Sequence, residues 1–223
     1  ESDIPVYRKT QKMNLLRLAV SRKDTYRIKE EFNVPGTKES IGQVLLTDLS
    51  VRRLDIRMGQ DEVLLRGELE VFCMYLSAEE KADWISQSVP FEGRILCDGV
   101  TESMFYHIQH TLEDTLTDVR LDEDGEMRVL GIEATLALRM NIFEEEETEV
   151  LKDLYSLEQQ CIFDTKETVL EELLMQNQSK CKVSERLSLP ELKEDVLQIL
   201  HSQGGIQLES EQHTSDGIRV EGI

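Results

Sequence analysis

The sequence predicts a mainly β protein, an antiparallel sandwich- or barrel-like module with a few short helices. Three observations favour this fold class: apolar and polar residues alternate over long stretches, Asp124-Gly125 has the composition of a hairpin turn, and helical stripes are few. The longest regular stretch spans residues 63–75, where one face is expected to be buried. Its apolar positions are Val63, Leu65, Gly67, Leu69, Val71, Cys73 and Tyr75, with Leu64, Phe72 and Met74 as exceptions to the alternation.

Three further stretches alternate with a period of two and predict strands. Gly67, in the middle of the stretch at residues 63–75, indicates a bulge or a close backbone approach. The alternating residues are Tyr26, Ile28, Phe32 and Val34 ahead of Pro35; Met104, Tyr106, Ile108, Leu112 and Leu116; and Arg128, Leu130, Ile132, Ala134, Leu136, Leu138, Met140 and Ile142.

Helices are expected in two places, where apolar residues recur at helical spacing. The first range is 166–177, with Val169, Leu170, Leu173 and Leu174, and the second is 190–201, beginning at Pro190. A shorter helix is expected after Pro35, and a turn of helix at residues 78–86.

The charge of the chain excludes one class of function. With 25 basic and 45 acidic residues among 223, the formal net charge is −20, which argues against nucleic-acid binding. No apolar run approaches the roughly 20 residues of a membrane helix. Residues 1–29 are basic and residues 113–172 strongly acidic. An electrostatic contact between these segments and a solvated acidic surface are both compatible with this distribution.

An internal repeat defines the predicted domains. Residues 32–45 and 187–200 align without gaps at an offset of 155 positions. We therefore expect a basic lead-in at residues 1–23, a β module at 24–162, and the start of a second, truncated copy at 163–223. On this interpretation the chain is a fragment of a longer protein. The coincident pairs include Pro35 and Pro190, Lys38 and Lys193, Glu39 and Glu194, Asp61 and Asp216, and Gly67 and Gly222.

No metal site is expected. His107 and His110 are three residues apart on a predicted strand, so their rings point to opposite faces, and His201 and His213 have no obvious partner. The acidic runs Glu144–Glu147, with Glu149 and Asp153, and Asp122-Glu123-Asp124-Gly125-Glu126 are compatible with calcium binding, but solvated loops explain them better. Cys73, Cys97, Cys161 and Cys181 form no Cys-x-x-Cys pair and are expected to be reduced thiols in a cytosolic protein.

No catalytic residue or cofactor site is expected either. The sequence contains no phosphate-binding glycine loop, nucleophile elbow or zinc-protease motif. Trp84, Phe91 and Tyr155 are the aromatic residues that a sugar or peptide groove would use. Aromatic residues make up only 5% of the chain, so most are needed in the core.

Several short motifs resemble the SPOCS domains of bacterial spore-coat and envelope proteins. They are Phe32-Asn33-Val34-Pro35 with Lys38 and Ile41, Arg66-Gly67-Glu68-Leu69 with the strand to Tyr75, Val89-Pro90-Phe91-Glu92, and Asp153-Leu154-Tyr155-Ser156. The resemblance covers residues 13–160, and a second copy begins near residue 163. It implies tandem modules typically followed by a LysM domain, and it supplies no catalytic residues.

Two functions are compatible with these observations. The first is a non-enzymatic structural or protein-interaction module in spore-coat or envelope assembly, on the mother-cell side of the forespore surface in the cytoplasm. Its partners would be coat or envelope assembly proteins. The alternative is a glycan-binding or hydrolytic envelope domain, which requires exposed aromatic residues beside carboxylates in a cleft.

Overall fold

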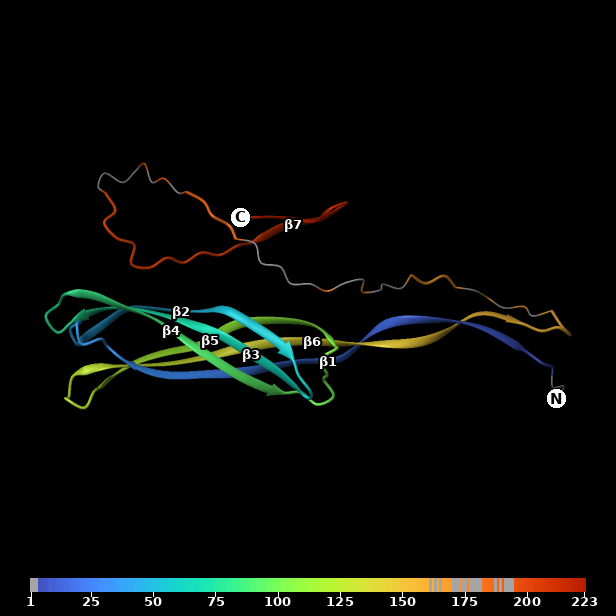
Figure 1. Cartoon of the computed structure of the whole chain (residues 1–223), viewed down its shortest axis with the longest axis horizontal. Helices are drawn as coiled ribbons and strands as arrows, with labels where there is room; N and C mark the ends of the chain where they lie inside the picture. Colours follow the sequence, from blue (N-terminus) through green and yellow to red (C-terminus); the bar gives the residue numbers. More distant parts are fainter. Residues whose placement is uncertain are drawn as a thin grey trace. The chain divides into compact units, whose positions relative to one another are not determined.

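The structure, a computed structural model, describes residues 4–160, 162, 164, 166–169, 173, 176, 182–186, 188, 190 and 195–223. This part of the chain contains strands and no helix (Figure 1). The strands are β1 (Tyr7–Asn33), β2 (Ile41–Met58), β3 (Glu62–Ser77), β4 (Ala82–Leu96), β5 (Phe105–Leu121), β6 (Met127–Tyr155), β7 (Leu208–Thr214) and β8 (Gly217–Gly222). The chain divides into two compact units, Glu1–Cys181 and Lys182–Ile223.

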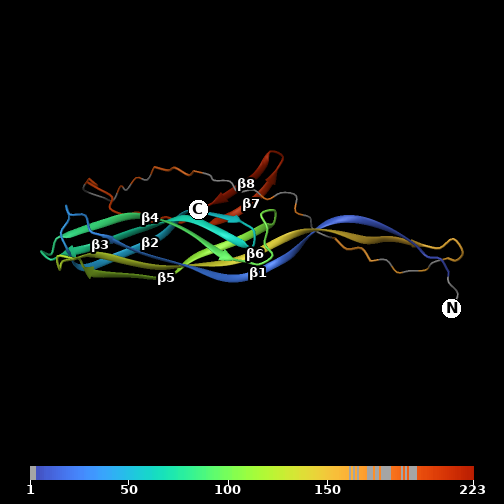
Figure 2. The ribbon, with the colours of Figure 1, turned by 60° about the horizontal axis from the view of Figure 1, so that its bottom comes forward.

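The first unit is built from two three-stranded antiparallel sheets. Their strand orders are β1-β6-β5 and β2-β3-β4. Buried apolar side chains of both sheets form one core cluster, and the two layers are visible in Figure 2. The mainly antiparallel β fold predicted from the alternation is therefore confirmed, in the form of a sandwich.

β3 shows why the sequence folds this way. Val63, Leu65, Leu69 and Val71 are each at most 1% exposed, as the alternation predicts. A fully buried aliphatic side chain of this kind contributes roughly 1.5–3 kcal/mol through removal of apolar surface from water. Cys73 is also fully buried and packs as a small apolar side chain.

Gly67 leaves room for an aromatic ring in the core. It lies directly opposite Phe91 on β4, and a Cβ atom at position 67 would come within 2.7 Å of the Phe91 ring. Any larger residue would therefore displace that ring. The close neighbour of this glycine is therefore a side chain and not the backbone expected, while the alternative, a bulge, is found in the β2–β3 ladder, whose register shifts between Arg52 and Asp55 opposite Gly67.

Side chains bridge the sheets along both pairs of edges. At the β1–β4 edge, the Tyr26 hydroxyl donates a hydrogen bond to the Glu92 carbonyl oxygen at 2.9 Å. At the β5–β2 edge, the Tyr106 hydroxyl donates to the Ile56 carbonyl oxygen at 2.7 Å. These bonds satisfy edge carbonyl groups and hold the two sheets together where backbone pairing ends.

β1 and β6 continue beyond the sandwich as a two-stranded ribbon (Figure 1). β5 pairs with β6 only as far as Phe143, so β1 is the remaining partner of residues 144–155 among the described residues. The ribbon joins the basic and the acidic segments: Lys12 contacts Glu147 at 2.6 Å, and Arg17 contacts Glu144 at 2.5 Å. The electrostatic contact between these segments thus lies within one chain, on exposed side chains.

The expected helices are not found among the described residues. Residues 36–38 form a turn before β2, and β4 already begins at Ala82, so the short helices expected after Pro35 and at 78–86 are wrong. The described residues of 166–177 and 190–201 are not helical, and the rest of both ranges lies outside the described residues. At 78–81 a tight reversal between the paired strands β3 and β4 takes the place of a helical turn, and after Pro35 a short loop leads from β1 in one sheet to β2 in the other.

Leu116 departs from the predicted face of its strand. The register of β5 against β6 shifts between Glu113 and Leu116, and Asp114 has a positive φ of 47°. This bulge changes the side-chain alternation, so Leu116 is exposed while Val119 packs against the core.

The second unit contains one hairpin, in which β7 pairs with β8. Its pairs run from Ser210 opposite Glu221 to His213 opposite Ile218. When the repeat offset of 155 is subtracted from each residue number, these pairs become those from Asp55 opposite Arg66 to Met58 opposite Val63. β2 and β3 make the same pairs. Both hairpins also shift register at the next step along the strand.

Candidate functional site

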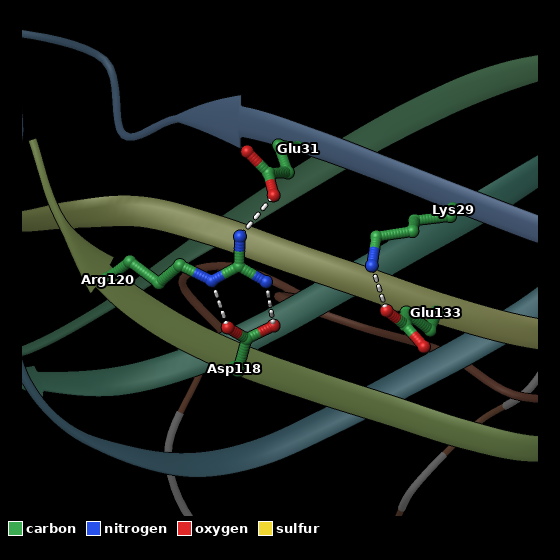
Figure 3. Close-up of polar contacts among 5 residues, drawn as sticks. All are labelled: Lys29, Glu31, Asp118, Arg120 and Glu133. Atoms are coloured by element: carbon green, nitrogen blue, oxygen red, sulfur yellow. Dashed lines mark hydrogen bonds and ion pairs between the residues drawn. The ribbon is translucent and has the colours of Figure 1, made fainter.

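The outer face of the β1-β6-β5 sheet carries charged side chains in cross-strand rows. Arg120 contacts Asp118 at 2.5 Å and also donates to Glu31 on the far strand β1 (Figure 3). Lys29 donates to Glu133 on the neighbouring strand. These side chains cover the end of the sheet nearest the β5–β6 turn with a polar layer.

Gly131 leaves space on the outer face for the side chains of this polar layer. It is paired with both Glu31 and Asp118, in the middle of the sheet. A Cβ atom there would collide with the Asp118 carboxylate, so a larger residue would displace that carboxylate from its position beside Arg120. The hydrogen bond and charge of Asp118, followed by those of Glu31, raise the pKa of Arg120. The hydrogen bond from Lys29 lowers the pKa of Glu133.

The outer face of the β2-β3-β4 sheet differs, because one of its ends is apolar. Leu46, Met74 and Trp84 lie in one row across the three strands. Leu46 is 51% exposed, and Met74, Trp84 and the neighbouring Leu76 are half-buried. Apolar side chains on the solvent side of a sandwich strand are typical of interaction surfaces. We call these four residues the Trp84 patch.

A polar network supports the Trp84 patch from the side. The Lys38 ammonium lies 4.8 Å from the centre of the Trp84 ring and 2.5 Å from an Asp83 carboxylate oxygen. Asp83 also accepts the backbone N–H of Trp84 at 2.8 Å. Burial and the Asp83 carboxylate raise the pKa of Tyr75 to about 12, and its hydroxyl donates to the Glu39 carbonyl oxygen.

The aromatic residues considered for a groove lie in three separate places. Trp84 is on the outer face of β4, while Phe91 is 7% exposed and belongs to the core. Tyr155 stacks on Tyr7 at the far end of the ribbon, with ring centres 5.4 Å apart. The structure does not bring them together, so the grouping suggested by their chemistry is wrong.

The histidines and acidic runs are also dispersed. His107 and His110 both lie on β5 and point to opposite faces, as predicted; His201 precedes β7, and His213 lies on it. The run Glu144–Glu147 alternates along β6, where three of its members contact Arg17 or Lys12. Within the described part of the chain, no group of three or more His, Cys, Asp or Glu residues is placed to hold a metal ion.

Asp122 shapes the hairpin turn that the sequence predicted at Asp124-Gly125. Its carboxylate accepts the backbone N–H groups of Asp124 at 3.0 Å and Glu126 at 2.9 Å, and Gly125 adopts a φ of +82°. The Asp122 carboxylate and the glycine of this acidic run thus serve the turn between β5 and β6.

The cysteines that the structure describes are buried and unpaired. Burial raises the pKa of the Cys73 thiol to about 11 and also raises that of Cys97. Neither thiol is therefore ionised to a reactive thiolate at neutral pH. Cys161 and Cys181 lie outside the described residues.

Sequence reasoning missed the Trp84 patch and the Lys38 network. One signal was present, because Met74 interrupts the alternation of β3. The patch also needs Leu46 and Trp84, which come from neighbouring strands. Periodicity within one strand does not contain that pairing.

Comparison with known proteins finds one family model that matches part of the chain. Residues 40–120 match the family model described as SipL, SPOCS domain; no curated protein and no solved structure matches the chain. The matched stretch contains β2, β3, β4 and nearly all of β5, and therefore the Trp84 patch. No helix among the described residues is long and apolar enough to cross a membrane. The resemblance seen in the sequence is thus confirmed over residues 40–120, which match the model of the SPOCS domain.

Proposed function

We propose that this chain is a non-enzymatic protein-interaction module that acts in spore-coat or envelope assembly, on the mother-cell side of the forespore surface. The SPOCS match supports the setting. The observation that carries the interaction role is the Trp84 patch, because it places Leu46, Met74 and Trp84 on the solvent face inside the matched residues. Tryptophan is among the residues that dominate binding energy in protein interfaces.

Localisation in a sporulating bacterium tests the proposal. A fluorescent fusion of the chain is expected to gather at the forespore surface, and the double variant Leu46→Ser, Trp84→Ser is expected to remain diffuse in the mother cell. Leu64→Ser is a matched control, because Leu64 is 40% exposed on the same outer face but lies near the other end of β3. Thermal unfolding of the purified variants checks that they fold. A folded double variant that localises like the unchanged chain would overturn the role of the patch.

We also infer that residues 163–223 begin a second copy of the module. The sequence repeat and the shared register of the β7–β8 and β2–β3 hairpins both support this inference. In the first copy, Asp61 in the hairpin turn accepts the Cys97 backbone N–H and donates its own to the Val100 carbonyl oxygen. The counterpart of Asp61 at the repeat offset is Asp216.

A further inference from the structure

A hollow lies on the charged outer face of the β1-β6-β5 sheet, away from Arg120. Its volume is about 590 Å³. Ala137, on the central strand β6, forms its floor, because a short side chain there is flanked by longer ones on β1 and β5. The side chains that line it on the outer face are those of Lys23, Thr25, Gln109, Thr111, Glu113 and Arg139.

Two cations lie side by side at one end of this hollow. Lys23 on β1 is directly opposite Arg139 on β6, and both side chains are exposed. Like charges directly opposite one another destabilise a pair of strands. In the part of the chain that the structure describes, neither residue forms an ion pair, whereas Lys29 and Arg120 on the same face each hold a carboxylate.

Neutral polar groups complete the lining. The row next to Lys23 and Arg139 consists of Thr25, Ala137 and Thr111, so two hydroxyl groups flank the floor. Gln109 is directly opposite Arg139 on the other side. Of the two acidic residues that line the hollow, Asp24 is held by Arg22 at 2.6 Å. Glu113 lies two rows from the cations, opposite Thr135.

We propose that this hollow, the Lys23–Arg139 hollow, binds carboxylate side chains of an extended, acidic segment of a protein partner. The inference rests on the proposed function and names the chemistry of one partner. Charge complementarity favours it, because among the described residues neither cation forms an ion pair, whereas Lys29 and Arg120 on the same face each hold a carboxylate. Arginine and threonine side chains both donate hydrogen bonds to a carboxylate. An extended segment suits an open sheet face, since its alternate side chains point the same way.

Fluorescence anisotropy with the full chain and a labelled peptide of alternating glutamate and serine tests the proposal. The double variant Lys23→Ala, Arg139→Ala is expected to bind about tenfold more weakly, because each exposed ion pair contributes up to about 1 kcal/mol. The control is Arg57→Ala, Arg94→Ala, which removes the same charge from one row on the outer face of the β2-β3-β4 sheet. Its affinity is expected to change less than twofold.

Three results would overturn the proposal: no binding by the unchanged chain, an equal loss in both double variants, or equal binding of a peptide with glutamine in place of glutamate. Displacement of the peptide by inorganic phosphate at concentrations similar to those of the free peptide would also overturn it, because the hollow would then be a site for small anions.

The assay contains no coat proteins. If the peptide fails to bind while the fusion still localises through the Trp84 patch, the inference about the hollow alone is wrong.

Discussion

Asp83 shows how single residues hold the edge of the β2-β3-β4 sheet. Its carboxylate accepts hydrogen bonds from the Lys38 ammonium and from the Trp84 backbone, and both Lys38 and Asp83 side chains are 26% exposed. Burial opposes ionisation of Asp83, but the hydrogen bonds and the charge of Lys38 outweigh it, so the pKa of Asp83 is lowered. The ionised carboxylate thereby fixes the turn before β2 against the start of β4.

We expect Asp83→Asn to lower the free energy of unfolding at pH 7 by about 1 kcal/mol. Because the folded-state pKa lies below the unfolded value of about 3.9, the stabilisation is fully present above that value. It is lost as the pH falls through the folded-state pKa. Urea unfolding at pH 7 and at pH 3 measures the free energy of unfolding of the variant and of the unchanged chain. The difference between the two free energies should shrink at the lower pH.

Glu79→Gln is the control for this measurement. Glu79 contacts Lys81 at 2.5 Å in the neighbouring turn, but the side chains are 61% and 70% exposed. We expect no measurable change in stability at either pH. The role assigned to the ionised carboxylate would be contradicted if Asp83→Asn and the unchanged chain differed in free energy of unfolding by the same amount at pH 7 and at pH 3.

At the scale of one element, β3 carries two leucines that differ in burial. Leu69 is fully buried between Val51 and Val89, whereas Leu64 is 40% exposed on the outer face. Leu69→Ala is expected to lower the free energy of unfolding by about 2–5 kcal/mol, because it removes apolar contacts and leaves a cavity. Leu64→Ala should cost less than about 1 kcal/mol. Chemical denaturation of the two variants compares the two faces, and equal losses would contradict the assigned orientation of the strand.

The strands themselves show what the sequence could and could not predict. The buried face of β3 and the long alternation of β6 were predictable, because each depends only on a period of two within one segment. Leu116 was assigned to the wrong face, since the bulge at Asp114 leaves no mark in the apolar pattern. The pairing of β1 with β6 was suggested only by opposite charge. It joins residues 96 to 148 positions apart, so no local pattern encodes it.

The same limit applies to both candidate surfaces. The Trp84 patch and the Lys23–Arg139 hollow each combine residues of three strands in one row. The sequence shows that Met74 breaks an alternation and that Lys23 is basic. It does not show that Leu46 and Trp84 flank Met74, or that Arg139 lies opposite Lys23. Those relations exist only once strand order and register are known.

At the scale of the whole molecule, the two units differ in how their strands are covered. In the first unit, β3 has hydrogen-bonded neighbours on both sides and a second sheet beneath its inner face. In the second unit β7 pairs only with β8 among the described residues, and Ile218 and Val220 are 64% and 60% exposed. Their counterparts at an offset of 155, Val63 and Leu65, are fully buried.

Limited proteolysis should therefore separate the two units. With a protease of broad specificity, we expect the first cuts within residues 182–223 and a resistant fragment that contains residues 7–155. The reason is that exposed backbone without neighbouring strands opens locally at little cost, while a central strand such as β3 opens only with the sandwich. Mass spectrometry of the fragments identifies the order of the cuts. If the protease cuts the loops of the first unit while it spares residues 202–223, the C-terminal strands belong to the fold of the first unit. The inference of a second copy would then fail, because the shared register would not mark the start of a separate module.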